Sequence, residues 1–311
     1  MRLSFRHLNL GDACEFWNSV APPDFQMEVG TLTHCVVGCP CFDWGASSAW
    51  LVDGQIAALA WVKKSAAHAY AGPDPEVTHL SAIAFRESSI GGDLLEDIRN
   101  LLRQRGRSAI QFGQDARHLF PGVPESWHGL REFLEIEGFV PKPADVCVDL
   151  RLDLADGEWT SDPRVRRCAL EDIPALLSFL DREFPGRWAH DVRDKLAHEV
   201  DPSFIYLWAD PDIQGFAMTQ TARHRLRIAG ATLVGGLPEP WSAVGPIGVS
   251  AERRGKGEGT AFLNGILADL KAREYRGVRV DWTRLTDWYT RFGFAVERRY
   301  VPMQLNLDDT F

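Results

Sequence analysis

The stretch that decides the fold is Ser250-Ala-Glu-Arg-Arg-Gly-Lys-Gly-Glu-Gly-Thr260, which follows an apolar run at 243–249. That run predicts a strand. The apolar residues after the stretch recur at helical spacing, namely Phe262, Leu263, Ile266, Leu267 and Leu270. They predict a helix over about 259–273. Glycines allow tight turns and close approach of amide groups, and a helix N-terminus favours negative charge. The stretch therefore has the outline of an anion site.

The glycine spacing excludes two common nucleotide-binding loops. The stretch contains neither G-x-x-x-x-G-K-[ST] nor G-x-G-x-x-G. A glycine-rich turn by itself is also typical of an ordinary surface loop. The sequence around the stretch is needed to distinguish an anion site from an ordinary surface loop.

Composition places the chain among ordinary globular proteins. It has 311 residues, of which 45% are hydrophobic and 25% charged, with a formal net charge of −9. Disordered, collagen-like and coiled-coil classes are excluded as overall descriptions. No apolar run reaches the roughly 18 residues of a membrane-spanning helix, and residues 1–10 carry charges where a signal peptide is apolar. We expect a cytoplasmic protein that binds neither membranes nor nucleic acid.

Two passages occur twice along the chain. Residues 3–12 resemble 165–172, with Asp12 and Asp172 separated by 160 positions. Residues 133–139 resemble 288–294, with Phe139 and Phe294 separated by 155 positions. A near-constant offset predicts two copies of one αβ unit. We place the two domains at 1–155 and 163–311, because the stretch between them is polar and contains Gly and Pro.

Each copy shows the same order of predicted elements. Hairpins are expected at 49–62, around the turn Asp53-Gly54, and at 204–219. A strand and a helix follow each hairpin, at 77–85 and 92–104 in the first copy and at 243–249 and 259–273 in the second. A last strand is expected at 278–282.

Six cysteines are few for this length, and four potential metal ligands crowd together as His34, Cys35, Cys39 and Cys41. Tetrahedral zinc requires four nitrogen or sulfur ligands, which this group could supply. It has neither C-x-x-C spacing nor a second paired half. We therefore expect buried or surface thiols in preference to a metal site.

The pattern Arg254-x-x-Gly257-x-Gly259, after Gly245-Pro-Ile-Gly-Val249 and about 30 residues before Trp288-Tyr-x-x-x-Gly-Phe294, resembles the GNAT superfamily of N-acetyltransferases. The resemblance covers roughly 165–307, and weakly the first half. It implies an α+β fold of two tandem GNAT-like domains, each a mostly antiparallel central sheet flanked by helices, the first one degenerate. It also implies acetyl-CoA as co-substrate and a small-molecule or peptide amine as acceptor, in a monomer or homodimer.

The resemblance assigns roles to individual residues. Backbone amides would hold the coenzyme pyrophosphate at Arg254, Gly255, Lys256, Gly257, Glu258, Gly259 and Thr260. The strand edge at Ile247, Gly248 and Val249 would pair with the pantetheine arm, and the Val249 amide would polarise the thioester carbonyl. Tyr289 would protonate the departing thiolate, since a phenol of pKa about 10 can donate to a thiolate of pKa about 8.5.

Other interpretations of the predicted catalytic residues stay open. Tyr289 also lies on an apolar helical stripe and could simply pack in the core. Asp281 at the end of its strand is the first candidate for the general base, followed by Glu183 and His224. Many GNAT members have Asn seven residues before the tyrosine, whereas this chain has Trp282.

The first copy departs from the GNAT pattern at two positions that the proposed chemistry requires. Ser89 stands in the place of Gly257 and Leu134 in the place of Tyr289. The first half is therefore expected to be a structural partner or a substrate wall, and binding of a second coenzyme there stays open as the alternative. Two alternatives to a general acetyltransferase remain: an acyl-CoA sensor without turnover, and a mycothiol-synthase-like enzyme, which Trp282 disfavours.

Overall fold

The computed structural model describes residues 1–65, 77–233 and 235–308, and its chain divides into two compact units. Described residues 1–65, 77–148 and 298–308 belong to the first unit, and 149–297 to the second. Each unit is built on a sheet with helices on its faces, so the mixed αβ class is confirmed. None of the described helices is long and apolar enough to cross a bilayer.

The first sheet has the strand order β1-β2-β3-β4-β5-β15-β7. Among the described strands of this sheet, β4 and β5 pair in parallel and the other neighbours pair antiparallel. The strands are β1 (Arg2–Ser4), β2 (Ser48–Val52), β3 (Gln55–Lys64), β4 (Val77–Phe85), β5 (Ala109–Phe112), β7 (Val140–Pro141) and β15 (Met303–Asn306). The helices are α1 (Leu10–Val20), the single turn α2 (Val29–Thr31), α3 (Ser88–Gln104) and α4 (His128–Ile136).

The central strands of this sheet are buried on both faces. Six successive residues of β3, from Ala57 to Val62, are buried, which fits a strand covered on both sides. Helices α1 and α3 both pack on β3 and β4. The Asn9 side chain caps α1 by accepting hydrogen bonds from the amides of Gly11 and Asp12. The hairpin predicted around Asp53-Gly54 is confirmed as β2 and β3.

The second sheet has the strand order β6-β14-β8-β13-β12-β11-β10-β9. Its strands are β6 (Val123–Pro124), β8 (Cys147–Asp153), β9 (Val165–Arg167), β10 (Ile205–Ala209), β11 (Ile213–Gln220), β12 (Trp241–Val249), β13 (Gly277–Thr283) and β14 (Ala295–Val301). Its helices are α5 (Ile173–Glu183), α6 (Arg187–Leu196), α7 (Glu258–Ala272) and the short α8 (Thr286–Thr290).

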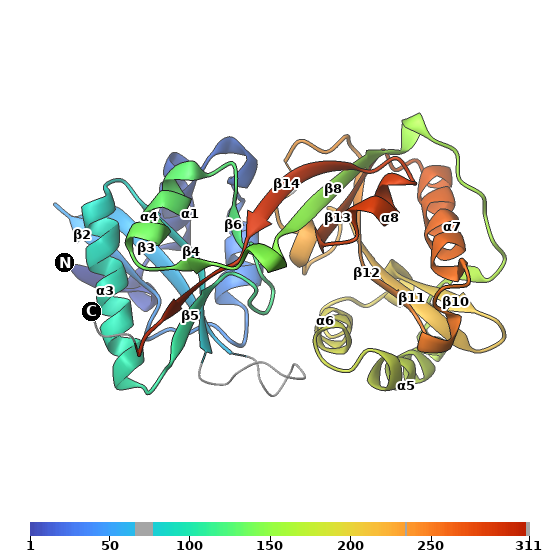
Figure 1. Ribbon diagram of the computed structural model, residues 1–311, viewed down its shortest axis with the longest axis horizontal. Helices are drawn as coiled ribbons and strands as arrows, with labels where there is room; N and C mark the ends of the chain where they lie inside the picture. Colours follow the sequence, from blue (N-terminus) through green and yellow to red (C-terminus); the bar gives the residue numbers. More distant parts are fainter. Residues whose placement is uncertain (66–76, 234, 309–311) are drawn as a thin grey trace. The chain divides into compact units, whose positions relative to one another are not determined.

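Alternating residues of β10 face opposite helices. Leu207 packs in one core with α5 and α6. Its neighbour Trp208 contacts Phe262 of α7, with ring centroids 5.8 Å apart, and the Tyr206 hydroxyl donates to Asp269 of α7. Because side chains alternate along a strand, α5 and α6 cover one face of the sheet and α7 the other. Figure 1 shows this arrangement in the second half.

Two strands lie in the sheet of the other half of the sequence. β15, close to the C-terminus, pairs with β5 and β7, whereas β8 lies between β14 and β13. Residues 149–155 therefore belong with the second unit and 298–308 with the first, which differs from the division into 1–155 and 163–311. The repeat in the sequence indicates two copies of one unit. The sheets to which β8 and β15 belong are decided by hydrogen bonds to strands that are distant in the sequence.

Two helices differ in extent from the sequence-based expectation. α3 begins at Ser88, earlier than the expected 92. α8 has only five residues and includes just Trp288 and Tyr289 of the apolar stripe. All six cysteines are buried, and they form no disulfide bonds.

Candidate active site

The site begins where strands β12 and β13 separate. They pair in parallel from Trp241 to Ala243, opposite Gly277 to Arg279, and the pairing ends there although both strands continue. The other edge of β12 stays paired with β11 as far as Val249. The segment 247–249 therefore presents a backbone edge toward the gap, where an extended ligand can add hydrogen bonds.

The hydrogen bonds of β12 show which amides face the gap. The Ser250 amide donates to the Gln214 carbonyl over 2.8 Å, on the β11 side. Successive amides of a strand point to opposite edges, so the Val249 amide points away from β11. Ile247, two residues earlier, has the same orientation. Val249 is thus placed to donate to a carbonyl oxygen in the gap.

The glycine-rich loop connects β12 to α7. Gly255 and Gly257 have φ values of +73° and +80°, a left-handed conformation that favours glycine. Gly257 is the N-cap of α7, and no described side chain caps the amides of the first turn. Arg254 donates to the Val249 carbonyl over 3.2 Å, and the Glu258 carboxylate accepts from Trp208 and Arg253. Because the Glu258 carboxylate is bonded elsewhere, the first-turn amides at 258–260 can bind an anion.

Tyr289 lies on α8 and is only 4% exposed. Burial, and then the nearby Asp281 carboxylate, raise the pKa of Tyr289 above its ordinary value, so the phenol keeps its proton at neutral pH. Asp281, on β13, also lies beside β12, because a Cβ on Gly245 would stand 3.5 Å from its Oδ1. The structure thus places Asp281 beside β12 and near enough to Tyr289 for its charge to act on the phenol.

The family comparison agrees with this geometry. Residues 173–294 match the acetyltransferase (GNAT) family model. This segment is a GNAT-family domain. A comparison with curated proteins found no significant match.

Similar solved structures extend the GNAT fold to both halves. A fungal multi-domain β-N-acetylglucosaminidase, described as having a GCN5-related glucosamine N-acetyltransferase region, aligns with a TM-score of 0.82 at 18% identity. The alignment covers 98% of this chain but only 38% of that one. A tandem GNAT protein from the clavulanic acid biosynthesis pathway aligns with a TM-score of 0.63 at 16% identity, covering 97% and 96%. A Sphaerobacter thermophilus N-acetyltransferase gives 0.60 at 16%, covering 86% and 83%. At such identities the likeness concerns the fold.

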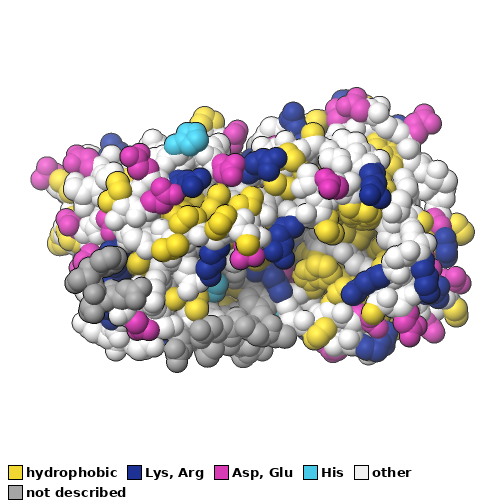
Figure 2. Space-filling view, in the orientation of Figure 1, with side chains coloured by type: hydrophobic (Ala, Val, Ile, Leu, Met, Phe, Trp, Pro, Cys, Tyr) yellow, Lys and Arg dark blue, Asp and Glu magenta, His cyan; other side chains and the backbone are white. Residues whose placement is uncertain are grey.

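A cavity of about 520 Å³ in the GNAT domain lies against the end of β12. Its wall combines three predicted coenzyme-contacting strand residues and Arg254 with the α5–α6 segment, namely Ile247, Gly248, Val249, Arg254, Phe184, Pro185, Arg187 and Trp188. Gly248 permits close packing, since a Cβ there would be 2.5 Å from the Phe184 ring. In Figure 2, hydrophobic side chains are visible in a hollow beside α6.

Trp282 was noted in the sequence only as a departure from the family pattern. Its φ is +43°, which is rare for a bulky residue, and its amide donates to the Asp149 Oδ1 over 3.1 Å. The Arg187 guanidinium lies over its ring, 4.4 Å from the centroid. Neither Arg187 nor Asp149 carried a sequence signal, because both contacts depend on the fold.

The two other candidates for the base have different surroundings. Glu183 accepts a hydrogen bond from the Ala251 amide over 3.0 Å, and this bond lowers the pKa of Glu183. Its carboxylate therefore anchors the glycine-rich loop. His224 lines a separate cavity with Phe204 and Thr221. Burial, followed by the charge of Lys195, lowers the pKa of His224 to about 4. His224 is not part of the β12 site.

The first unit lacks the same features. α3 begins two residues after Arg86, without a left-handed glycine, and Leu134 is buried on α4. The segment after β5 packs back on β4, where Ser81 donates to Asp115 over 2.8 Å. Asp115 also accepts from the buried Lys63 over 2.5 Å. At these described positions the first unit therefore has neither a glycine-rich loop like 254–260 nor a tyrosine in place of Tyr289.

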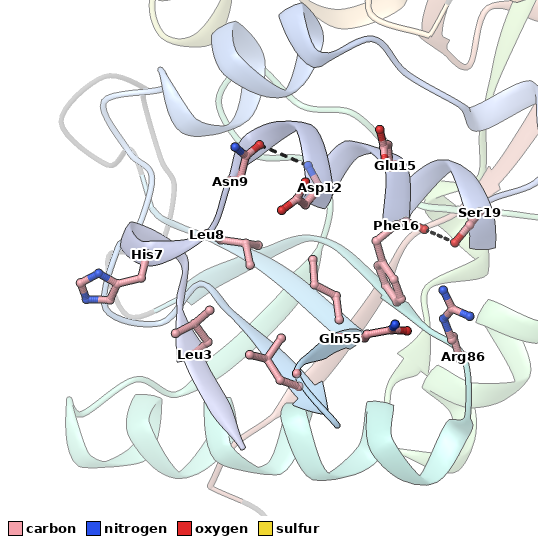
Figure 3. A pocket seen from close by; sticks show the side chains of 13 residues that line it. Leu3, His7, Leu8, Asn9, Asp12, Glu15, Phe16, Ser19, Gln55 and Arg86 are labelled. Atoms are coloured by element: carbon pink, nitrogen blue, oxygen red, sulfur yellow. Dashed lines mark hydrogen bonds between the residues drawn. The ribbon is translucent and has the colours of Figure 1, made fainter.

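The first unit has a cavity of another kind, of about 730 Å³, between α1 and the β2–β3 hairpin. Figure 3 shows Phe16 extending from α1 into it, and the Arg86 guanidinium lies 5.6 Å from that ring. Asp12 and Glu15 of the same wall are exposed. This cavity is lined by α1 and the β2–β3 hairpin, whereas the cavity in the GNAT domain is lined by the end of β12 and the α5–α6 segment.

Proposed function

We propose that the C-terminal half transfers an acetyl group from acetyl-CoA directly to a primary amine of a small molecule or peptide. The separation of β12 from β13 after Ala243 is the observation that carries this proposal. It gives the pantetheine arm a backbone edge at 247–249. The uncapped first turn of α7 is suited to the coenzyme pyrophosphate.

The reaction would need no covalent enzyme intermediate. The amine nitrogen attacks the thioester carbon, and the carbonyl oxygen, which becomes negative, accepts a hydrogen bond from the Val249 amide. The C–S bond then breaks, and the sulfur takes its proton from the Tyr289 hydroxyl. Asp281 is the candidate acceptor for the proton that the attacking ammonium loses. Its charge also keeps Tyr289 protonated until that step.

The test measures free thiol after the full-length protein is mixed with acetyl-CoA and single amines. The panel should include glucosamine, because the fungal region with a similar fold is described as a glucosamine N-acetyltransferase. Amine-dependent thiol release supports the proposal. Tight coenzyme binding without release by any amine would favour an acyl-CoA sensor. Absence of coenzyme binding would contradict both functions.

A further inference from the structure

Two glycines lie beside the Asp281 side chain. A Cβ on Gly230 would stand 2.8 Å from the Asp281 Cβ, and one on Gly245 would stand 3.5 Å from Oδ1. The turn at Gly230 is fixed by the buried Gln220 side chain, which donates to the Ile228 carbonyl and accepts from the Ile228 amide, each over 2.8 Å. The Asp281 side chain is therefore bounded by a turn that only glycine allows to come so close.

The backbone that carries Asp281 has an unusual conformation at the next residue. Trp282 has a left-handed φ of +43°, although it lies within β13, where φ is ordinarily about −120° to −140°. A bulky residue keeps such a conformation only where its surroundings hold it, and these conformations are concentrated at functional sites. Because Asp281 is bonded directly to Trp282, relaxation of this φ would move the Asp281 carboxylate.

Asp149 holds the backbone at Trp282. Its Oδ1 accepts a hydrogen bond from the Trp282 amide over 3.1 Å, and the Asp149 residue is only 4% exposed. Loss of this acceptor would deprive a partly buried amide of its hydrogen bond, which is unfavourable. The left-handed conformation at Trp282 therefore depends on a side chain of the neighbouring strand β8.

We propose that Asp149 is a positioning residue for Asp281. By holding the left-handed backbone at Trp282, Asp149 keeps the Asp281 carboxylate beside β12, where the acceptor amine loses its proton in the proposed reaction. Asp149 acts through the backbone and takes no proton itself. This inference rests on the proposed acetyl transfer, because it assigns a further residue to one step of that reaction.

Two substitutions of Asp149 in the full-length protein separate positioning from charge. Asp149→Asn removes the carboxylate but keeps an oxygen that can accept from the Trp282 amide, so kcat for an accepted amine should stay within a few-fold. Asp149→Ala removes the acceptor and should lower kcat by about 10- to 100-fold, because a misplacement of about 1 Å can cost about 100-fold. KM for acetyl-CoA should change little in both variants, since the coenzyme edge at 247–249 is retained.

Nuclear magnetic resonance reports on Asp281 without turnover. In protein prepared with isotope-labelled aspartate, the carboxyl signal of Asp281 is assigned by its loss in Asp281→Asn. The signal should move in Asp149→Ala and stay near its wild-type position in Asp149→Asn. Asp153→Ala is the matched control, because Asp153 lies on the same strand as Asp149 and pairs with Arg276 over 3.1 Å. It should leave both the signal and kcat unchanged.

A second displacement of Asp281 keeps the test decisive if thermal unfolding shows that Asp149→Ala is not folded. The Cβ of Gly230→Ala would meet the Asp281 Cβ, so the signal should move and kcat should fall. Gly235→Ala is its control, because a Cβ on Gly235 would meet nothing within 4 Å.

Three outcomes would overturn the inference: a wild-type Asp281 signal in Asp149→Ala, a normal kcat in a variant whose signal has moved, or equal losses of kcat in Asp149→Asn and Asp149→Ala. Wild-type kcat in Asp281→Asn would contradict the proposed base and this inference with it. Absence of thiol release with every amine would contradict the proposed transfer, and the Asp281 signal would still decide whether Asp149 holds that carboxylate.

Discussion

The backbone amide of Trp282 donates a hydrogen bond to Oδ1 of Asp149, with 3.1 Å between the two atoms. Asp149 lies on β8, a strand from the N-terminal half of the sequence, and Trp282 on β13 of the GNAT domain. The end of β13, where Asp281 also lies, is thus held by a residue 133 positions earlier in the chain. A fragment cut at the sequence repeat would lose this contact.

Fragments with different boundaries should behave differently. Residues 145–301 retain β8 between β14 and β13, so we expect a monodisperse protein with cooperative unfolding. Residues 163–311 lack β8 and carry β15 without β5 and β7, which leaves open sheet edges prone to aggregation. Size-exclusion chromatography and urea unfolding measure both. A well-folded 163–311 fragment would show that β8 is dispensable.

Val249→Pro removes one amide proton from the gap side of β12. Pairing with β11 should survive, since it uses the neighbouring Ser250 amide. Loss of a donor to the developing oxyanion should lower kcat by about 10²- to 10³-fold. Val249→Ala, the control, keeps the amide and should retain kcat within a few-fold. Equal kcat values for the two variants would mean that the Val249 amide does not contact the carbonyl.

Tyr289→Phe keeps the ring but removes the proton donor. General acid catalysis is worth about 10²- to 10⁴-fold, so kcat should fall by that factor while coenzyme affinity changes little. Tyr275→Phe, in the same half but in the wall of the separate His224 cavity, should leave kcat unchanged. If Tyr289 only packs in the core, its variant will show an altered unfolding free energy and normal turnover.

His224 should make the protein less stable in mild acid. Its pKa is about 4 in the folded state and about 6.5 when exposed. Between these values the unfolded chain binds a proton that the folded chain does not, so the free energy of unfolding falls as pH decreases from 6.5 to 4. His224→Asn should make this dependence shallower. Urea unfolding at pH 7, 5.5 and 4.5 provides the comparison, and parallel curves would rule out this contribution.

Lys63 should be essential to the first unit. Its ammonium is fully buried and donates to Asp115 and to the carbonyls of Cys35, Ala116 and Arg117. Lys63→Met leaves the Asp115 charge without this partner, which should cost about 3–5 kcal/mol of unfolding free energy. Lys64→Met changes an exposed neighbour and should have little effect. Chemical denaturation of both variants measures how much unfolding free energy is lost when Lys63 is replaced.

Local signals in the sequence determined much of the GNAT domain. The hairpins, α7 and the loop at 250–260 follow from patterns of period two and 3.6 and from glycines, all of which act between near neighbours in the chain. The candidate role of Tyr289 came from the family resemblance and that of Asp281 from its position at the end of a strand. The structure places Asp281 beside β12 and near enough to Tyr289 for its charge to act on the phenol.

Tertiary structure alone decided the rest. Hydrogen bonds between strands that are distant in the sequence determine the positions of β8 and β15 in the two sheets. The sequence repeat could not reveal these positions, because both copies contain a strand that could occupy them. Packing placed Glu183 on the Ala251 amide and His224 in another cavity. It also brought Arg187 over Trp282, which are 95 positions apart in the chain. Such contacts depend on how helices pack on a sheet, and no local pattern of residues specifies them.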